Sequence, residues 1–146
     1  MPPSKPDALT QATRLLASTD KTRAQLVEAL RRKGYPPPEI DQALTRAQAL
    51  GYLDDARFAR KKALAELRAG WAGEALLARL TGAGLDEALA RAAVAEAAFE
   101  VRWVALEAAR ALMTARKVTG AKAARLLASR GFEEDVVERL VRLPQD

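Results

Sequence analysis

The chain has 146 residues, of which 49% are hydrophobic and 5% aromatic, and its formal net charge is +5. The absence of cysteine and histidine excludes disulfides and thiolate metal sites and removes the commonest general base and nucleophile. No apolar run is long enough to span a membrane, and the first residues lack the apolar core of a signal peptide. We therefore expect a soluble, cytoplasmic protein without enzymatic activity, metal or cofactor, whose basic charge favours acidic partners.

The first part of the chain predicts three helices. A helical pattern covers Ala8–Ala17. Thr22 and Gln25 have the spacing of a capping box, which predicts the start of a second helix that ends before Gly34. Pro36, Pro37 and Pro38 then begin a third helix, because an amide in the first helical turn needs no partner.

The middle part begins with a helix stop followed by a helix start. Gly51 can adopt a positive φ just past a helix end, and Asp54 can accept hydrogen bonds from the first amides of the next helix. That helix is predicted over Asp55–Ala69, with Phe58, Ala65 and Ala69 on its core face. The adjacent carboxylates of Asp54 and Asp55 could in principle bind a cation, but we interpret them as capping groups.

A pattern of apolar residues before a glycine occurs three times with a period near 50 residues. Each copy predicts a helix, a glycine corner and a second helix, and another helix precedes each copy. The third of these preceding helices is predicted over Glu100–Arg116. No segment has the composition of a strand, so the sequence predicts an all-α protein of three tandem three-helix repeats, residues 1–50, 51–99 and 100–146. The three corner glycines are Gly34, Gly84 and Gly131.

A basic stripe is predicted on the first helix of the middle repeat. The spacing of Arg57, Lys61 and Arg68 places them within about 40° on one helical face, with Arg60 close by and Leu64 inside the stripe. One interpretation is a contact surface for a partner, anchored by Leu64. The other is a solvated face that happens to be basic, and both stay open.

Further candidate cations lie near helix ends. Arg31 and Arg32 precede the first corner, and Arg125 and Arg130 precede the third. Cations at these positions complement the helix dipole, so a structural role and a partner-binding role both stay open. Trp71, at a turn, could stack on a base or a side chain or could pack under the corner.

The run from Gly51 to Ala59, Gly-Tyr-Leu-Asp-Asp-Ala-Arg-Phe-Ala, closely resembles the signature of the RecX family, regulators of the RecA recombinase. Arg32-Lys33-Gly34-Tyr35, Gly70-Trp71 and Ser129-Arg130-Gly131-Phe132 are further points of resemblance. The resemblance implies an elongated, curved molecule of three three-helix repeats. It also implies a monomeric regulator that binds RecA filaments and inhibits recombinase and ATPase activity. Single-stranded DNA would be a second partner where the bound regulator reaches it. Homologous recombination, DNA repair and the SOS response would be modulated as a result.

Two residues depart from that family pattern. Glu66 and Ala75 stand where basic residues are frequent, and the middle repeat is electrically neutral. An alternative function is a helical module that binds DNA directly, which a steep salt dependence would reveal. A carboxylate-dependent enzyme is a third interpretation, which metal-dependent turnover would reveal.

Overall fold

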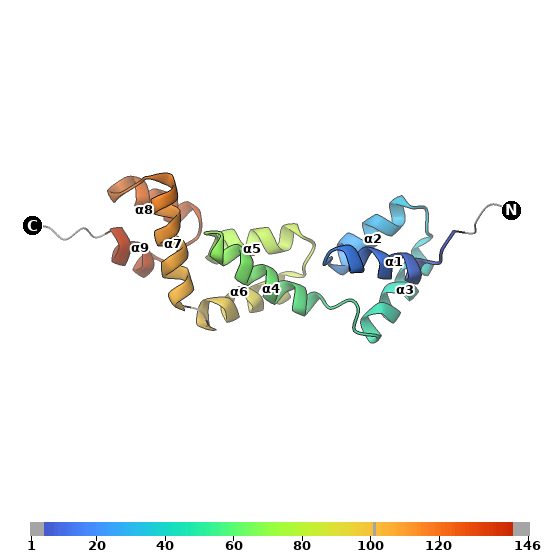
Figure 1. Cartoon of the computed structure of the whole chain (residues 1–146). Helices are drawn as coiled ribbons and strands as arrows, with labels where there is room; N and C mark the ends of the chain where they lie inside the picture. The colour runs from blue at the N-terminus through green and yellow to red at the C-terminus, as the bar shows by residue number, and fades with distance from the viewer. Residues whose placement is uncertain (1–4, 101, 142–146) are drawn as a thin grey trace, which may run out of the picture. The chain divides into compact units, whose positions relative to one another are not determined.

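The computed structural model describes residues 5–100 and 102–141, and within these residues the chain forms nine α-helices and no strand (Figure 1). The all-α prediction is confirmed. The helices are α1 (Ala8–Ser18), α2 (Arg23–Arg32), α3 (Pro37–Ala49), α4 (Asp55–Arg68), α5 (Gly73–Gly82), α6 (Glu87–Glu100), α7 (Arg102–Arg116), α8 (Gly120–Ser129) and α9 (Glu134–Val141).

Most predicted helix boundaries agree with the structure, because local capping determines them. Thr22 N donates to Gln25 Oε1 at 3.0 Å and Gln25 N donates to Thr22 Oγ1 at 3.1 Å, which is the predicted capping box. Asp54 Oδ1 accepts from Arg57 N at 3.0 Å, as expected for a cap. One boundary was wrong: Glu100 is the last residue of α6 and does not belong to the following helix.

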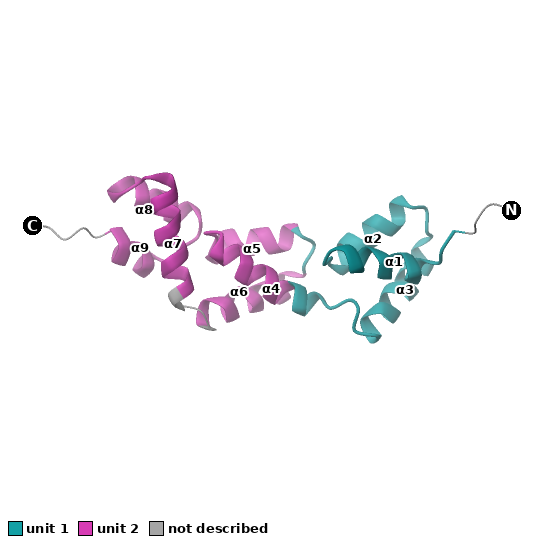
Figure 2. Cartoon of the chain, in the orientation of Figure 1, with its two compact units in different colours: residues 1–58, 83–85 teal, residues 59–82, 86–146 magenta. Residues whose placement is uncertain are grey.

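The chain divides into two compact units, shown in two colours in Figure 2. Unit 1 comprises residues 1–58 and 83–85, and unit 2 comprises residues 59–82 and 86–146. The expected division into three repeats stays a prediction. In the part of the chain that the structure describes, no helix has both the length and the apolar character needed to cross a membrane.

Unit 1 is built around the apolar faces of α1, α2 and α3. Burying each leucine of this core contributes roughly 1.5–3 kcal/mol to folding. Asp55 adds a polar link, because its Oδ1 accepts a hydrogen bond from Arg23 N at 2.9 Å and so satisfies an amide at the start of α2. The buried core residues are Ala8, Ala12, Leu26, Leu30, Tyr35, Ile40, Ala43, Leu44, Ala47 and Leu53.

In unit 2, α4 turns a different face to the core from the one predicted. Its buried residues are Ala59, Ala63 and Leu67, spaced four apart. Ala65 and Ala69 are exposed, so their assignment to the core face was wrong. The helix is rich in alanine on several sides, and alanine alone does not mark the buried face.

A backbone contact joins the α4–α5 and α8–α9 corners within unit 2. Ala72 N donates a hydrogen bond to the Arg130 carbonyl at 2.8 Å. A Cβ on Gly131 would lie 1.9 Å from the Ala72 carbonyl oxygen, so only glycine allows this approach. We call this pairing the 72–131 contact. It holds the two corners in register and positions the side chains next to them.

Candidate partner-binding surface

The predicted basic stripe has its side chains on the surface. In unit 2, Arg60, Lys61 and Arg68 are exposed and Leu64 is half-buried. The reason is the helical repeat, since the buried row of α4 leaves the adjacent row, Arg60–Leu64–Arg68, at the edge of the core. Arg60 and Arg68 have no ion-pair partner among the described residues.

Arg57 lies in the first turn of α4, which belongs to unit 1. It is exposed, and its Nη1 and Nη2 atoms each lie 3.4 Å from the Gly51 carbonyl oxygen. These distances are at the long end for hydrogen bonds. The guanidinium can therefore leave this position at little cost.

Arg130 stacks on an aromatic ring in unit 2. Its Cζ atom lies 4.0 Å from the ring centroid of Trp71, and Arg79 Cζ lies 4.4 Å from a ring centroid of the same side chain. Trp71 is half-buried, so both are cation–π contacts in a partly desolvated place. Trp71 thus stacks on two guanidinium side chains, which is one of the interpretations that the sequence left open. The sequence did not indicate Arg79, because it lies eight residues after Trp71, on α5, whereas Trp71 lies in the turn before that helix.

A carboxylate next to this stack compensates the charge of Arg79. Arg79 Nε donates to Glu66 Oε2, and Lys62 Nζ lies 3.3 Å from Glu66 Oε1. The Glu66 side chain is 14% exposed. Burial raises the pKa of Glu66, but the hydrogen bonds from Arg79 and Lys62 outweigh it and hold the pKa below its usual value. Glu66, the acidic residue that departs from the family pattern, thus forms ion pairs with Lys62 and Arg79 of the same molecule.

Arg31 and Arg32 share one carboxylate on the surface of α2. Arg31 Nη2 lies 2.8 Å and Arg32 Nε 3.0 Å from Glu28 Oε1. The hydrogen bonds from Arg31 and then Arg32 lower the pKa of Glu28. By contrast, Arg125 on α8 is exposed and has no ion pair among the described residues. The candidate cations thus divide into two groups. Arg31 and Arg32 are compensated by a carboxylate, whereas Arg125 is uncompensated among the described residues.

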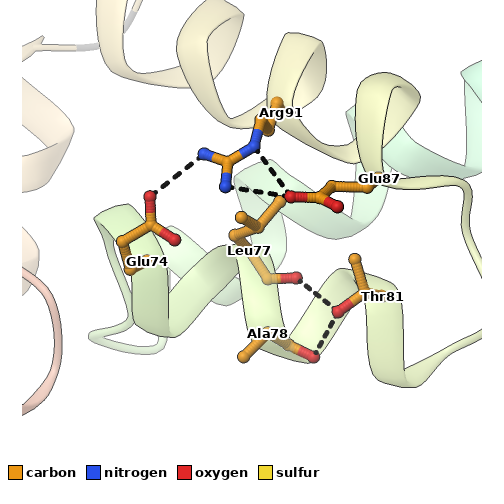
Figure 3. A network of polar contacts seen from close by, with 6 residues as sticks. All are labelled: Glu74, Leu77, Ala78, Thr81, Glu87 and Arg91. Atoms are coloured by element: carbon orange, nitrogen blue, oxygen red, sulfur yellow. Dashed lines mark hydrogen bonds and ion pairs between the residues drawn. The ribbon is translucent and has the colours of Figure 1, made fainter.

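An ion-pair network links α5 and α6 at the edge of a groove (Figure 3). Arg91 of α6 pairs with Glu74 of α5 at 3.1 Å and with Glu87 of its own helix at 3.0 Å. The groove has a volume of about 930 Å³ and lies between α5, α6, α7 and α9, with Leu77 and Phe99 among its lining residues. Nothing in the sequence pattern indicated it.

Most of the candidate cations lie on exposed surfaces that a partner could contact. Within residues 5–100 and 102–141, no three carboxylates gather as metal ligands. Asp54 accepts a hydrogen bond from Arg57 N and so caps α4, as predicted, whereas Asp55 accepts one from Arg23 N at the start of α2. Arginines that have no ion pair among the described residues can bind carboxylates or phosphates of a partner. They include Arg60, Arg68 and Arg125.

Several known proteins have sequences similar to this chain. A family model described as RecX, first three-helix domain, matches residues 8–46. The regulatory protein RecX of Thermobifida fusca is 39% identical over 138 residues, which cover 88% of this chain and 74% of that protein. The chain belongs to the RecX family. The regulatory protein RecX of Thermus thermophilus is 35% identical over 141 residues, covering 96% of this chain and 94% of that protein.

A further RecX relative is matched over a shorter stretch. The protein of Syntrophotalea carbinolica is 39% identical over 89 residues, and this RecX-family chain spans 58% of its length. The crystal structure of RecX from Lactobacillus salivarius has a TM-score of 0.73 and 16% identity, over 92% of each chain. That likeness supports the fold alone. The RecX-family chain is thus an all-helical member of a family of regulatory proteins.

Proposed function

We propose that this RecX-family chain binds the RecA recombinase on its DNA filament and inhibits the recombinase and its ATPase. It modulates homologous recombination, DNA repair and the SOS response in this way, and it acts in the cytoplasm as a monomer. It works by binding and not by catalysis.

The observation that carries this proposal is the exposed row on α4 in unit 2. Arg60 and Arg68 have no ion pair among the described residues, and half-buried Leu64 lies between them. Two uncompensated guanidiniums on either side of an apolar group suit an acidic protein surface with a hydrophobic contact at its centre. Lys61 on the same helix, and Arg57 in its first turn, are proposed as additional contacts.

The test is inhibition of the DNA-dependent ATPase of RecA by a double charge reversal, Arg60→Glu with Arg68→Glu. We expect the concentration needed for half inhibition to rise about tenfold, because rim charges steer and orient the complex. The control is Arg14→Glu with Arg46→Glu, which makes the same change in net charge at exposed arginines without ion pairs in the described part of unit 1. Leu64→Ala should also weaken inhibition.

Stability and function should separate in these variants. Exposed charges contribute within about 1 kcal/mol to folding, so the double variant should melt near the parent temperature. Inhibition equal to the parent's for both α4 variants would show that this row is solvated surface. Arg31, Arg32, Arg125 and Arg130 would then be the next candidates.

A second candidate function, direct binding to DNA, is favoured by Arg125. It is exposed on α8 and has no carboxylate partner among the described residues. Affinity for naked single-stranded DNA should then fall steeply with salt, because each phosphate contact releases counterions. A protein-led contact instead requires RecA for tight binding.

A further inference from the structure

The groove between α5, α6, α7 and α9 has an apolar floor that the proposed function does not use. All of its lining residues belong to unit 2. Leu67, Leu76 and Phe132 are buried residues of the floor, and Phe99 lines the groove while it is 74% exposed. A concave apolar surface bordered by polar groups is typical of an interaction site.

The 72–131 contact holds one end of this groove. Ala72, Gly73 and Gly131 are among the lining residues, and a Cβ on Gly73 would lie 2.5 Å from the Gly131 carbonyl oxygen. Backbone therefore meets backbone where α5 and α9 begin, so the shape of this end does not depend on movable side chains. An occupant binds a surface that is already formed, which lowers the cost of ordering it.

The charged side chains of the groove lie at its rim. The Glu74 and Arg91 side chains are 79% and 53% exposed, and Glu133, Asp135 and Arg139 are exposed as well. A small-molecule site instead has a few polar groups that converge on the ligand inside the cavity. An apolar centre with a solvated polar rim is the construction of a protein–protein interface.

The rim is acidic although the chain as a whole has a net charge of +5. Arg91 is shared between two carboxylates, those of Glu74 and Glu87 (Figure 3). Glu133 and Asp135, at the start of α9, have no ion pair among the described residues. The rim thus has four carboxylates against the two guanidiniums that line the groove. Its charge complements a basic occupant.

The groove has the dimensions of a short helical segment. Its lining residues on α6 run from Arg91 to Phe99, which is about 12 Å along the helix axis. About two turns of a bound helix fit this length, with large apolar side chains at every third or fourth position. The volume of about 930 Å³ leaves room for several such side chains.

We propose that the groove binds a basic amphipathic helix of a partner protein. The apolar side chains of that helix lie on the floor, and its lysines or arginines pair with Glu133 and Asp135. This site goes beyond the proposed function and does not depend on it. The acidic surface that suits the arginines of α4 would be repelled by the rim, so the two surfaces take different segments.

A second copy of this chain is the less suitable occupant. Its α4 also presents a leucine between arginines, in the row Arg60–Leu64–Arg68. A contact between the groove of one copy and α4 of the next is heterologous, and unless its rotation closes a ring it continues from copy to copy as a filament. A different protein fills the groove without this consequence.

The test uses three labelled synthetic peptides of about 15 residues, the length at which an isolated helix becomes marginally stable. The first has a leucine stripe at helical spacing flanked by lysines, the second has glutamates in place of the lysines, and the third is a scrambled form of the first. Fluorescence anisotropy measures their binding to the full chain. We expect the lysine peptide to bind at least about tenfold more tightly than either of the others.

One variant blocks the floor of the groove. Ala98 is exposed and lines the groove, so Ala98→Trp places a large ring where the apolar side chains of the occupant must lie. Ala92→Trp is the matched control, because Ala92 is exposed about 120° away around the same helix and does not line the groove. We expect Ala98→Trp to weaken binding of the lysine peptide about tenfold and Ala92→Trp to change it less than about twofold.

A second variant reverses the charge of the rim. Glu133→Lys with Asp135→Lys should weaken binding of the lysine peptide about tenfold and strengthen binding of the glutamate peptide. Glu134→Lys with Glu138→Lys makes the same change in net charge at exposed positions of α9 that do not line the groove, and should have a smaller effect. Circular dichroism checks folding, and the charge variants decide the test if Ala98→Trp does not fold.

Equal binding of the lysine, glutamate and scrambled peptides, or no binding of any of them, would overturn the inference. So would a loss that is as large in the control variants as in the groove variants. Sedimentation of the chain alone tests the other occupant: self-association that Ala98→Trp abolishes would identify a second copy and overturn the proposal of a different protein.

Discussion

The corners that follow α2 and α8 have similar local sequences and the same turn, but different groups of the molecule contact them. Gly34 and Gly131 have φ of +90° and +87°, and in both corners the carbonyl of the preceding residue accepts a hydrogen bond. At Gly34 the donor is the flexible side chain of Lys5, and at Gly131 it is the backbone of Ala72. The turn is a local property, whereas the cost of disturbing it depends on the neighbour.

The largest expected effect comes from adding one methyl group at each corner. Gly131→Ala should lower the free energy of unfolding by about 3 kcal/mol or more, because left-handed strain adds to a collision with the Ala72 backbone. Gly34→Ala should cost about 1 kcal/mol, because its new Cβ meets only the movable end of Lys5 at 3.3 Å. Urea denaturation measures both, and equal losses would contradict the comparison.

The next effect concerns Trp71, whose ring stacks on Arg130 next to the Gly131 corner. Trp71→Ala should lower the free energy of unfolding by about 2 kcal/mol, because it removes a half-buried ring and two guanidinium contacts. Trp71→Phe keeps an aromatic face and should recover part of that loss. Thermal melting of the two variants separates them. If both lose the same amount, the stacking on Arg79 and Arg130 contributes nothing.

A smaller effect separates the two carboxylates that hold arginines. Glu66→Gln should cost about 1 kcal/mol, because Arg79 and Lys62 lose their partner at a mostly buried position. Glu28→Gln should leave the melting temperature unchanged within error, since that ion pair is exposed to solvent. Equal melting shifts for the two variants would show that burial of Glu66 does not matter.

The smallest effect is a pH dependence with a definite sign. The pKa of Glu66 in the folded state lies below its ordinary value of 4.5, so the unfolded state binds more protons in acid. The stabilisation is present above about pH 4.5 and is lost as the pH falls toward the folded-state pKa. Glu66→Gln should flatten this part of the stability curve. A curve as steep as the parent's would assign the acid sensitivity to other carboxylates, such as Asp7 and Glu28, whose pKa values are also lowered.

Local features were predictable from the sequence because each depends on residues within one or two turns. The capping box at Thr22, the cap at Asp54 and the left-handed corner glycines are of this kind. The choice of buried face on α4 was not predictable, since alanines lie on several of its sides and a small side chain carries little information about burial.

The sequence by itself therefore determined an all-helical chain, its helix starts and stops and its membership of a family of regulators. Only the tertiary structure decided which cations are compensated, because Glu66 reaches Arg79 from another helix and Trp71 meets Arg130 across 59 positions of the chain. Such contacts join residues distant in sequence, and packing, rather than local propensity, brings them together.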